Sequence, residues 1–201
     1  MFRLVCGACR LSATEERQRF FLGRSVLELG SGLGLLGIGL SKLGASRVML
    51  TDLPAQMPLL TRNLRENADD CDRLQVCVLE WGTCPEELAR QRWDLIVGAD
   101  LVYDEEAMPA LALTLGQLLH RNQGARAILV LPDRSEFEST QGARPDYCVL
   151  FELLARPQHG ALHTCQVGAV SSQEAGTLSS NMHIFVVSQH PGGSAPASQP
   201  I

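Results

Sequence analysis

Short apolar segments alternate with amphipathic segments along most of this 201-residue chain. Five of the apolar segments have the length of buried strands, at residues 24–29, 47–51, 75–79, 94–99 and 127–131. Segments whose apolar residues are spaced as on a helix follow the strand candidates. In residues 105–121, for example, leucines recur on one helical face. Such alternation is typical of a parallel sheet whose crossover helices cover both faces. The pattern therefore predicts an α/β fold.

The end of the chain departs from this alternation. A helical segment at 147–155 precedes two strand-like runs, around 162–167 and 183–187, with a loop rich in Gly and Ser between them. Two successive strands favour a hairpin, in which neighbouring strands are antiparallel. We therefore expect a seven-stranded, mostly parallel sheet with one antiparallel strand and helices on both faces.

The length suits one domain, which we place at residues 24–188. Residues 1–23 form a short N-terminal segment before the first strand, and we interpret it as a truncated lid. Residues 189–201 are rich in Pro, Gly, Ser and Ala, a composition that predicts a disordered tail.

A glycine-rich loop comes directly after the first strand candidate, with Gly30, Ser31, Gly32 and Gly34 in close succession. In open parallel sheets, ligands bind beyond the carboxyl ends of the strands. Asp52 ends the next strand, and its two carboxylate oxygens are suited to accept hydrogen bonds from the hydroxyls of a ribose. The loop and Asp52 together predict a site for a nucleoside cofactor.

The loop leaves two cofactor classes open. Gly32, Gly34 and Gly37 satisfy the dinucleotide fingerprint, and Asp52 lies at the roughly 20-residue distance expected of it, so a nicotinamide-dependent oxidoreductase remains an alternative. A dinucleotide needs a pyrophosphate site at the helix N-terminus, whereas S-adenosylmethionine does not. With Glu28 before it, the loop resembles the first motif of S-adenosylmethionine methyltransferases more than a dinucleotide loop. Trp81, as a stacking wall for adenine, also favours S-adenosylmethionine.

Asp100 and Tyr103 follow the fourth strand candidate, beside the predicted pocket. A carboxylate and a phenol at this edge are suited to orient an incoming amine and to accept its hydrogen bonds. Methyl transfer needs little else, because the sulfonium is already activated and the protein mainly aligns the nucleophile. We therefore predict that Asp100 and Tyr103 are the catalytic pair.

These residues, taken in order, resemble the family-16 seven-β-strand protein-lysine methyltransferases. The matching motifs are the glycine loop with its preceding Glu at 26–34, Thr51-Asp52, Glu80-Trp81-Gly82 and the D-x-x-Y signature at 100–103. They cover roughly residues 20–135. The resemblance implies a Rossmann-like, class I methyltransferase fold and ε-amino methylation of lysine in a protein substrate such as a chaperone, an ATPase or a translation factor.

The resemblance also implies a role for each site residue. Glu28, Gly30, Ser31, Gly32 and Gly34 belong to the cofactor loop, Asp52 holds the ribose, Trp81 and Ala99 flank the adenine, and Asp100 and Tyr103 lie at the lysine entrance. One relative in this group is thought to modify arginine, so a protein-arginine methyltransferase stays an alternative. Relatives carry a tryptophan before the first strand that this chain lacks, so a cofactor-free interaction module or inactive form is a second alternative.

Charge and cysteine content narrow the range of partners. The formal net charge is -5 without a basic stripe, so we expect no nucleic-acid partner. No apolar run approaches the ~20 residues that span a bilayer, so we expect no membrane segment. Cys6 and Cys9 form a lone C-x-x-C without a second pair, so we assign no metal. The odd total of seven cysteines predicts reduced thiols in an intracellular protein. We further expect a monomer that is located in the cytoplasm and also in the nucleus.

Overall fold

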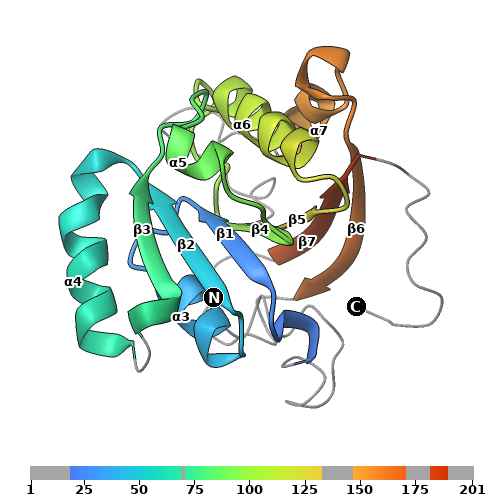
Figure 1. The fold of residues 1–201 in the computed structure, drawn as a ribbon. Helices are drawn as coiled ribbons and strands as arrows, with labels where there is room; N and C mark the ends of the chain where they lie inside the picture. The colour runs from blue at the N-terminus through green and yellow to red at the C-terminus, as the bar shows by residue number, and fades with distance from the viewer. Residues whose placement is uncertain (1–18, 69–70, 133–146, 171–181, 190–201) are drawn as a thin grey trace.

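The computed structural model describes residues 19–68, 71–132, 147–170 and 182–189 (Figure 1). These residues contain one seven-stranded sheet of order β3-β2-β1-β4-β5-β7-β6. Its strands are β1 (Ser25–Leu29), β2 (Arg47–Asp52), β3 (Leu74–Val78), β4 (Leu95–Ala99), β5 (Arg126–Pro132), β6 (His163–Val170) and β7 (Met182–Ser188).

The first five strands are parallel to one another, and β7 is antiparallel to both of its neighbours, β5 and β6. This arrangement confirms the predicted mostly parallel sheet with one antiparallel strand. The hairpin expected at the end of the chain is the β6–β7 pair, and β7 lies between β5 and β6 in the sheet.

Alternation along β1 explains why helices cover both faces of the sheet. Leu27 and Leu29 face a core shared with the later helices, whereas Val26 faces a core shared with the earlier ones. Figure 1 shows these two layers on either side of the sheet. The helices are α3 (Leu35–Lys42), α4 (Met57–Asn67), α5 (Glu86–Ala89), α6 (Met108–Arg121) and α7 (Tyr147–Leu154), with 3₁₀ turns η1 (Pro54–Gln56), η2 (Cys71–Arg73) and η3 (Pro157–His159).

Strand order decides where a ligand site lies. β1 pairs with β2 on one side and with β4 on the other, so that Glu28 stands between Leu50 and Val97. The chain therefore leaves the sheet in opposite directions from β1 and from β4, and the loops after these strands part at that point. Such a switch point is where open parallel sheets bind ligands.

Some boundaries differ from the sequence-based expectation. The helix expected from residue 105 begins at Met108, because residues 105–107 form a turn and Pro109 suits the first helical turn. β6 extends to Val170 and contains a register shift between Gln166 and Gly168. The short helix α5 was not expected, since four residues carry too little periodicity to be recognised.

Leu33 lies outside the helix that leucine spacing predicts for it. Its spacing to Leu36 predicts a shared helical face, yet α3 begins after Gly34, and Leu33 is 59% exposed in the loop that precedes it. Leu36 is buried as expected. The left-handed conformation of Gly34, the residue before the helix with φ +78°, delays the start of α3 to Leu35.

The expected lid at 1–23 and tail at 189–201 lie almost wholly outside the described residues. Of the lid segment the structure describes residues 19–23, which begin with a helical turn at 19–21, and of the tail only residue 189. Cys6 and Cys9 also lie outside the described part. Within it, no helix is both long and apolar enough to cross a membrane.

Candidate active site

A cavity of about 650 Å³ opens at the carboxyl edge of the sheet, where β1, β2, β3 and β4 end. Residues from all four following loops line it, which is why segments distant in the sequence meet there. The predicted site residues on its wall are Gly30, Gly32, Asp52, Trp81, Asp100 and Tyr103. The cavity has the size of a small-molecule or cofactor site.

Two glycines of the loop after β1 have different roles. Gly30 permits close packing, and Gly32 leaves its backbone open to the cavity. A Cβ on Gly30 would lie 2.8 Å from Leu101 Cδ2 and 3.6 Å from the Trp81 ring, so the absence of a side chain lets these groups close in. A Cβ on Gly32 would meet nothing within 4 Å, so its backbone borders open space. Both residues have positive φ, at +59° and +54°, which favours glycine.

The Asp52 carboxylate is held rigidly at the end of β2. Its Oδ2 accepts a hydrogen bond from the Gly32 N–H at 2.7 Å, and its Oδ1 accepts one from the Leu53 N–H at 2.8 Å. Each carboxylate oxygen can accept a second hydrogen bond. Asp52 therefore links the glycine loop to β2 and keeps acceptor capacity for the two hydroxyls of a ribose.

Glu28 is a buried carboxyl on the α3 side of β1, only 3% exposed. Burial raises its pKa to about 8, although Ser31 and the Gly37 N–H partly oppose the rise. Within the described residues, Glu28 Oε2 and Ser31 Oγ make no hydrogen bond of ordinary geometry. At neutral pH the Glu28 carboxyl is therefore mostly protonated, and both buried oxygens lie beside the glycine loop without lining the cavity.

Trp81 and Tyr103 form the aromatic part of the cavity wall. Their ring centroids lie 6.2 Å apart with the planes inclined at 48°. Gly82 after Trp81 donates its N–H to Thr114 Oγ1 of α6 at 2.7 Å, and this bond fixes the turn that presents the indole. An indole held in this way is suited to pack against a flat heterocycle such as adenine.

Tyr103 presents its ring at the mouth of the cavity, where the residue is 60% exposed. Partial burial and then the nearby carboxylates of Asp52, Asp104 and Asp100 raise the pKa of its hydroxyl above the usual value. The phenol therefore stays protonated at neutral pH and can both donate and accept a hydrogen bond.

Asp100 has a strained backbone, with φ +57° in the left-handed region that side chains rarely adopt. Its N–H donates to the Val130 carbonyl of β5 at 2.9 Å, which ties the turn to the neighbouring strand. Strain of this kind persists only where surrounding contacts impose it, and it concentrates at functional positions. It directs the chain after β4 so that Asp100 and Tyr103 both reach the cavity.

The electrostatic character of the cavity is uniform. Four carboxylates line it, from Asp52, Glu80, Asp100 and Asp104, and the described lining contains no Lys, Arg or His. Negative charge in a partly enclosed site attracts cationic ligands. Both a sulfonium cofactor and a lysine side chain meet that requirement.

Four predicted cofactor residues, Glu28, Ser31, Gly34 and Ala99, lie next to the wall and do not line the cavity. A Cβ on Gly34 would lie 2.7 Å from Leu60, so this glycine permits close packing of α4. Sequence reasoning missed several lining residues, all of them near a predicted one in the sequence: Leu33, Leu53, Gln56, Leu79, Glu80, Leu101, Asp104, Ala107 and Ala110.

In the described part of the chain, no group of three His, Cys, Asp or Glu is placed to hold a metal ion.

Comparison with known proteins decides which family this site belongs to. A model of the lysine methyltransferase family matches residues 9–141, a range that contains the whole described cavity lining. The chain belongs to the lysine methyltransferase family. This membership confirms the resemblance drawn from the glycine loop, Trp81 and the D-x-x-Y signature, and it disfavours a nicotinamide-dependent oxidoreductase.

Individual members of the lysine methyltransferase family align with part of the chain. EEF1A lysine methyltransferase 3 of Xenopus tropicalis is 40% identical over 104 residues, which cover 52% of this chain and 46% of that protein. Protein N-lysine methyltransferase METTL21A of Danio rerio is 43% identical over 98 residues, 48% of this chain and 44% of that protein. The chain thus matches about half the length of these relatives.

Solved structures of more distant proteins share the fold. Magnesium protoporphyrin IX methyltransferase of Synechocystis PCC 6803, with bound S-adenosylhomocysteine, has a TM-score of 0.60 at 15% identity, covering 87% of this chain and 81% of that one. The glycopeptide N-methyltransferase MtfA, complexed with S-adenosylmethionine, has a TM-score of 0.60 at 16% identity, covering 89% and 87%. The sheet of this family member is therefore that of class I, S-adenosylmethionine-dependent methyltransferases.

Proposed function

We propose that this protein transfers a methyl group from S-adenosylmethionine to the ε-amino nitrogen of a lysine in a protein substrate. The observation that carries the proposal is one cavity with two distinct walls. Gly32, Asp52 and Trp81 form a wall suited to a nucleoside, and Asp100 and Tyr103 form a wall suited to an amine.

The chain's own residues fit the proposed cofactor. Asp52 keeps free acceptor positions for ribose hydroxyls, the open space at Gly32 admits a ligand close to the backbone, and Trp81 offers a flat apolar surface. When bound, S-adenosylmethionine supplies an electrophilic methyl group on a sulfonium, with S-adenosylhomocysteine as the leaving group.

At the substrate wall, Asp100 and Tyr103 would accept hydrogen bonds from the ε-amine and orient its lone pair. The attacking nitrogen must first lose a proton to solvent or to a nearby base, since an ammonium has no lone pair to donate. The new N–CH₃ bond then forms as the S–CH₃ bond breaks. Alignment of this kind is what an enzyme chiefly contributes when the leaving group is already activated.

The substrate, location and assembly of the protein are also proposals. We infer a protein substrate of the chaperone, ATPase or translation-factor class, and the relative named for EEF1A supports testing EEF1A first. Lysine is favoured over arginine because the family is described as lysine methyltransferases. We further propose a monomer that acts in the cytoplasm and the nucleus.

The test begins with calorimetric titration of S-adenosylhomocysteine into the purified chain and into Asp52→Ala. Loss of the charged acceptor should weaken binding at least about tenfold, the effect of one or two charge-assisted hydrogen bonds. Asp72→Ala, which removes an exposed carboxylate in η2, is the matched control and should bind like the parent chain.

Methyl transfer is then measured with isotopically labelled S-adenosylmethionine and candidate proteins, followed by identification of the modified residue. Labelled lysine that disappears in Asp100→Asn supports the proposal, and labelled arginine would correct the residue type. A chain that folds but binds no S-adenosylhomocysteine would contradict it and favour a cofactor-free interaction module.

A further inference from the structure

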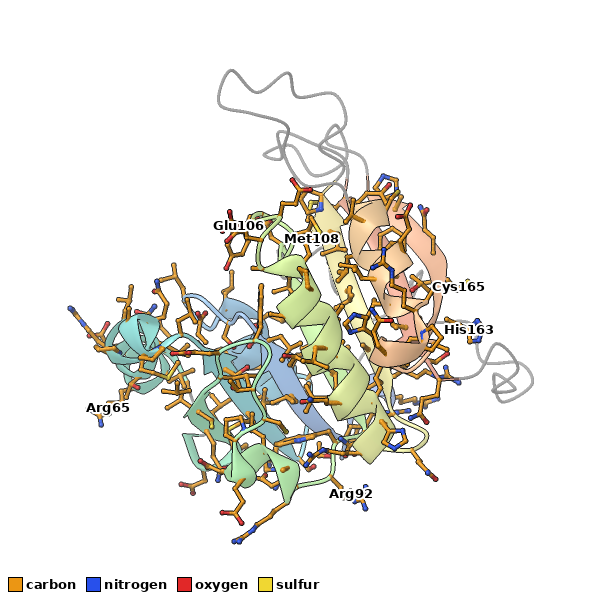
Figure 2. All side chains as sticks on the ribbon, turned by 90° about the horizontal axis from the view of Figure 1, so that it is seen from above. Arg65, Arg92, Glu106, Met108, His163 and Cys165 are labelled. Atoms are coloured by element: carbon orange, nitrogen blue, oxygen red, sulfur yellow. The ribbon has the colours of Figure 1, made fainter. Side chains whose placement is uncertain are left out.

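A second cavity, of about 800 Å³, lies at the opposite edge of the sheet from the candidate active site. The end of α5, the segment leading into β4 and the end of α6 form its wall. Figure 2 shows Arg92 near the C-terminal end of α6, away from Glu106 and Met108 at the other end. β4 separates the two edges by five residues, a rise of roughly 16 Å, so one small ligand cannot occupy both cavities.

Arginines dominate this second wall. Arg90, Arg92 and Arg121 line it together with His120, and all four side chains are exposed. Arg90 already pairs with Glu86 of α5, so Arg92 and Arg121 are the cations that remain available to a ligand. Asp94 is the one carboxylate among the described lining residues. It accepts hydrogen bonds from the Ser25 N–H at 2.7 Å and the Ser25 hydroxyl at 2.8 Å, and its pKa is lowered first by the former bond. That carboxylate is therefore already engaged.

Internal contacts hold the cationic groups in place. Arg92 donates a hydrogen bond to the carbonyl of Arg121 at the end of α6, and Arg47 donates to the carbonyl of Arg92 at 3.1 Å. The Arg47 guanidinium also stacks over the Trp93 ring, 4.4 Å from its centroid. Guanidinium groups held in this way lose less side-chain entropy when an anion binds them.

Unpaired donors accompany these cations. Trp93 lines the cavity and is only 3% exposed, yet its Nε1–H has no acceptor among the described residues. The Nε of Arg47 is likewise buried without an acceptor there. Arg47 and Gln91, whose side-chain oxygen is also buried and unpaired, lie beside the lining residues rather than among them. The exposed guanidinium groups of Arg92 and Arg121, with the unpaired Trp93 N–H beside them, suit ligands that bring acceptors, above all oxyanions.

We propose that this arginine-lined cavity docks an acidic segment, rich in Asp and Glu, of a partner protein. The chain carries a net charge of -5, so the cavity is a local exception on an acidic molecule rather than part of a basic stripe. A continuous nucleic-acid backbone needs such a stripe, whereas a few carboxylates need only one basic pocket. The inference does not depend on the proposed methyl transfer.

The test uses fluorescein-labelled hexaglutamate as the probe and hexaglutamine as its neutral counterpart, titrated with the full chain and followed by fluorescence polarisation. Hexaglutamate should bind saturably, and raised ionic strength should weaken it. In the double variant Arg92→Gln/Arg121→Gln, affinity should fall roughly tenfold or more, since each partly exposed ion pair contributes up to about fivefold.

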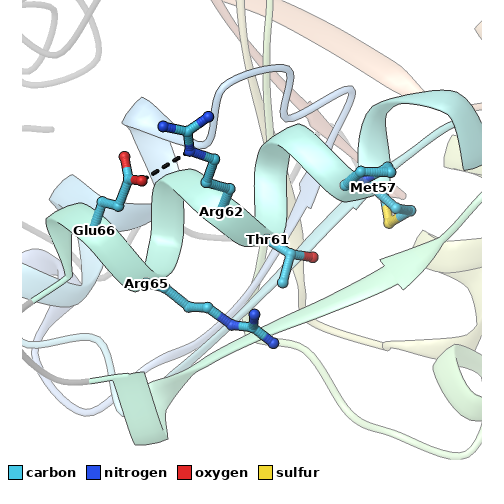
Figure 3. Close-up of a pocket in the computed structure, with 6 residues that line it drawn as sticks. Met57, Thr61, Arg62, Arg65 and Glu66 are labelled. Atoms are coloured by element: carbon cyan, nitrogen blue, oxygen red, sulfur yellow. Dashed lines mark hydrogen bonds and ion pairs between the residues drawn. The ribbon is translucent and has the colours of Figure 1, made fainter.

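The matched control is Arg62→Gln/Arg65→Gln on α4, which removes two exposed arginines from a separate surface depression (Figure 3). Arg62 there pairs with Glu66 at 2.8 Å, just as Arg90 of the arginine-lined cavity pairs with Glu86, so the two surfaces are comparable in this respect. The control should bind hexaglutamate like the parent chain. Replacing Arg92 also removes its hydrogen bond to the main-chain carbonyl at the end of α6. The single variant Arg121→Gln keeps that bond and should show a smaller loss of hexaglutamate affinity.

Three results would overturn the proposal. One is equal hexaglutamate affinity in the parent chain and in a folded Arg92→Gln/Arg121→Gln protein. Another is equal binding of hexaglutamine, which would remove charge as the cause. The third is tighter binding of an oligothymidylate of matching charge that is lost in the same double variant, since that would make the ligand a nucleic acid. Affinity for S-adenosylhomocysteine, measured on the same variants, should stay unchanged.

Discussion

At the residue scale, the role of some side chains in the site follows from the residue type alone. The protonation state of others depends on how deeply the fold buries them. Asp52 acts through its position at a strand end, which its sequence neighbours already indicate. Glu28 differs, because removal from water raises its pKa to about 8. Its charge state at neutral pH is thus set by the packing of α3 against β1.

Glu28 predicts a specific dependence of folding stability on pH. A carboxyl whose pKa is raised on folding, from 4.5 to about 8, stabilises the fold fully below pH 4.5 and loses that contribution as the pH rises toward 8. In Glu28→Gln the free energy of unfolding should vary less over this range, by an amount on the order of a few kcal/mol. Urea unfolding at pH 5, 6.5 and 8 measures it, and identical pH profiles for the two proteins would contradict the prediction.

Tyr103 predicts a separation of catalysis from cofactor binding. Tyr103→Phe keeps the ring beside Trp81 but removes the hydroxyl at the proposed lysine entrance. We expect kcat to fall about a hundredfold, the scale of a lost proton-handling or orienting group, with unchanged affinity for S-adenosylhomocysteine. Steady-state kinetics and calorimetry on the same preparation test this, and an unchanged kcat would remove Tyr103 from the catalytic pair.

At the element scale, loops carry the site and helices hold the loops. Residues 80–83 form a turn after β3 in which the Thr83 N–H returns to the Glu80 carbonyl at 3.1 Å. The same turn is tied to α6 through Thr114, which is 1% exposed and accepts from the Gly82 N–H. The orientation of Trp81 therefore depends on a hydroxyl more than thirty residues away in the sequence.

Thr114→Val should loosen this turn. The isosteric change keeps the packing of α6 but leaves the Gly82 N–H without its acceptor, at a cost of about 1–3 kcal/mol. We expect a lower melting temperature and a several-fold weaker affinity for S-adenosylhomocysteine, both restored by Thr114→Ser, which keeps the hydroxyl. If valine and serine variants bind alike, the hydrogen bond does not position Trp81.

At the scale of the whole molecule, the last described strand completes the sheet. β7 pairs with β5 over Ala127–Pro132 and is also the partner of β6 within the described residues. Its apolar side chains contribute to both cores, because Phe185 faces one and Ile184 the other. A strand that is late in the sequence thus lies in the interior of the sheet rather than at its edge.

Truncation tests this dependence. A chain ending at Val170 lacks β7, so β5 and β6 lose their shared partner, and we expect no cooperative urea transition. A chain ending at Gln189 keeps β7 and should unfold with a free energy close to that of the full chain. Circular dichroism during urea titration distinguishes the two, and a cooperative transition in the shorter protein would show that β7 is dispensable.

The sequence by itself determined the alternation of strands and helices, the antiparallel final pair and the edge that carries the glycine loop. These features follow from local periodicity and from glycine and acidic residues at strand ends, which are read within a few positions. For the same reason the predicted residues that line the cavity were found mainly at loop positions directly after strands.

Only the tertiary structure decided the features that depend on distant partners. Leu33 lines the cavity because Gly34 delays the start of α3, and Asp100 adopts its strained conformation because β5 binds its backbone. The arginine-lined cavity arises because α6 ends beside the segment that enters β4. Sequence spacing cannot show such contacts, since the strand order brings together residues that the chain keeps far apart.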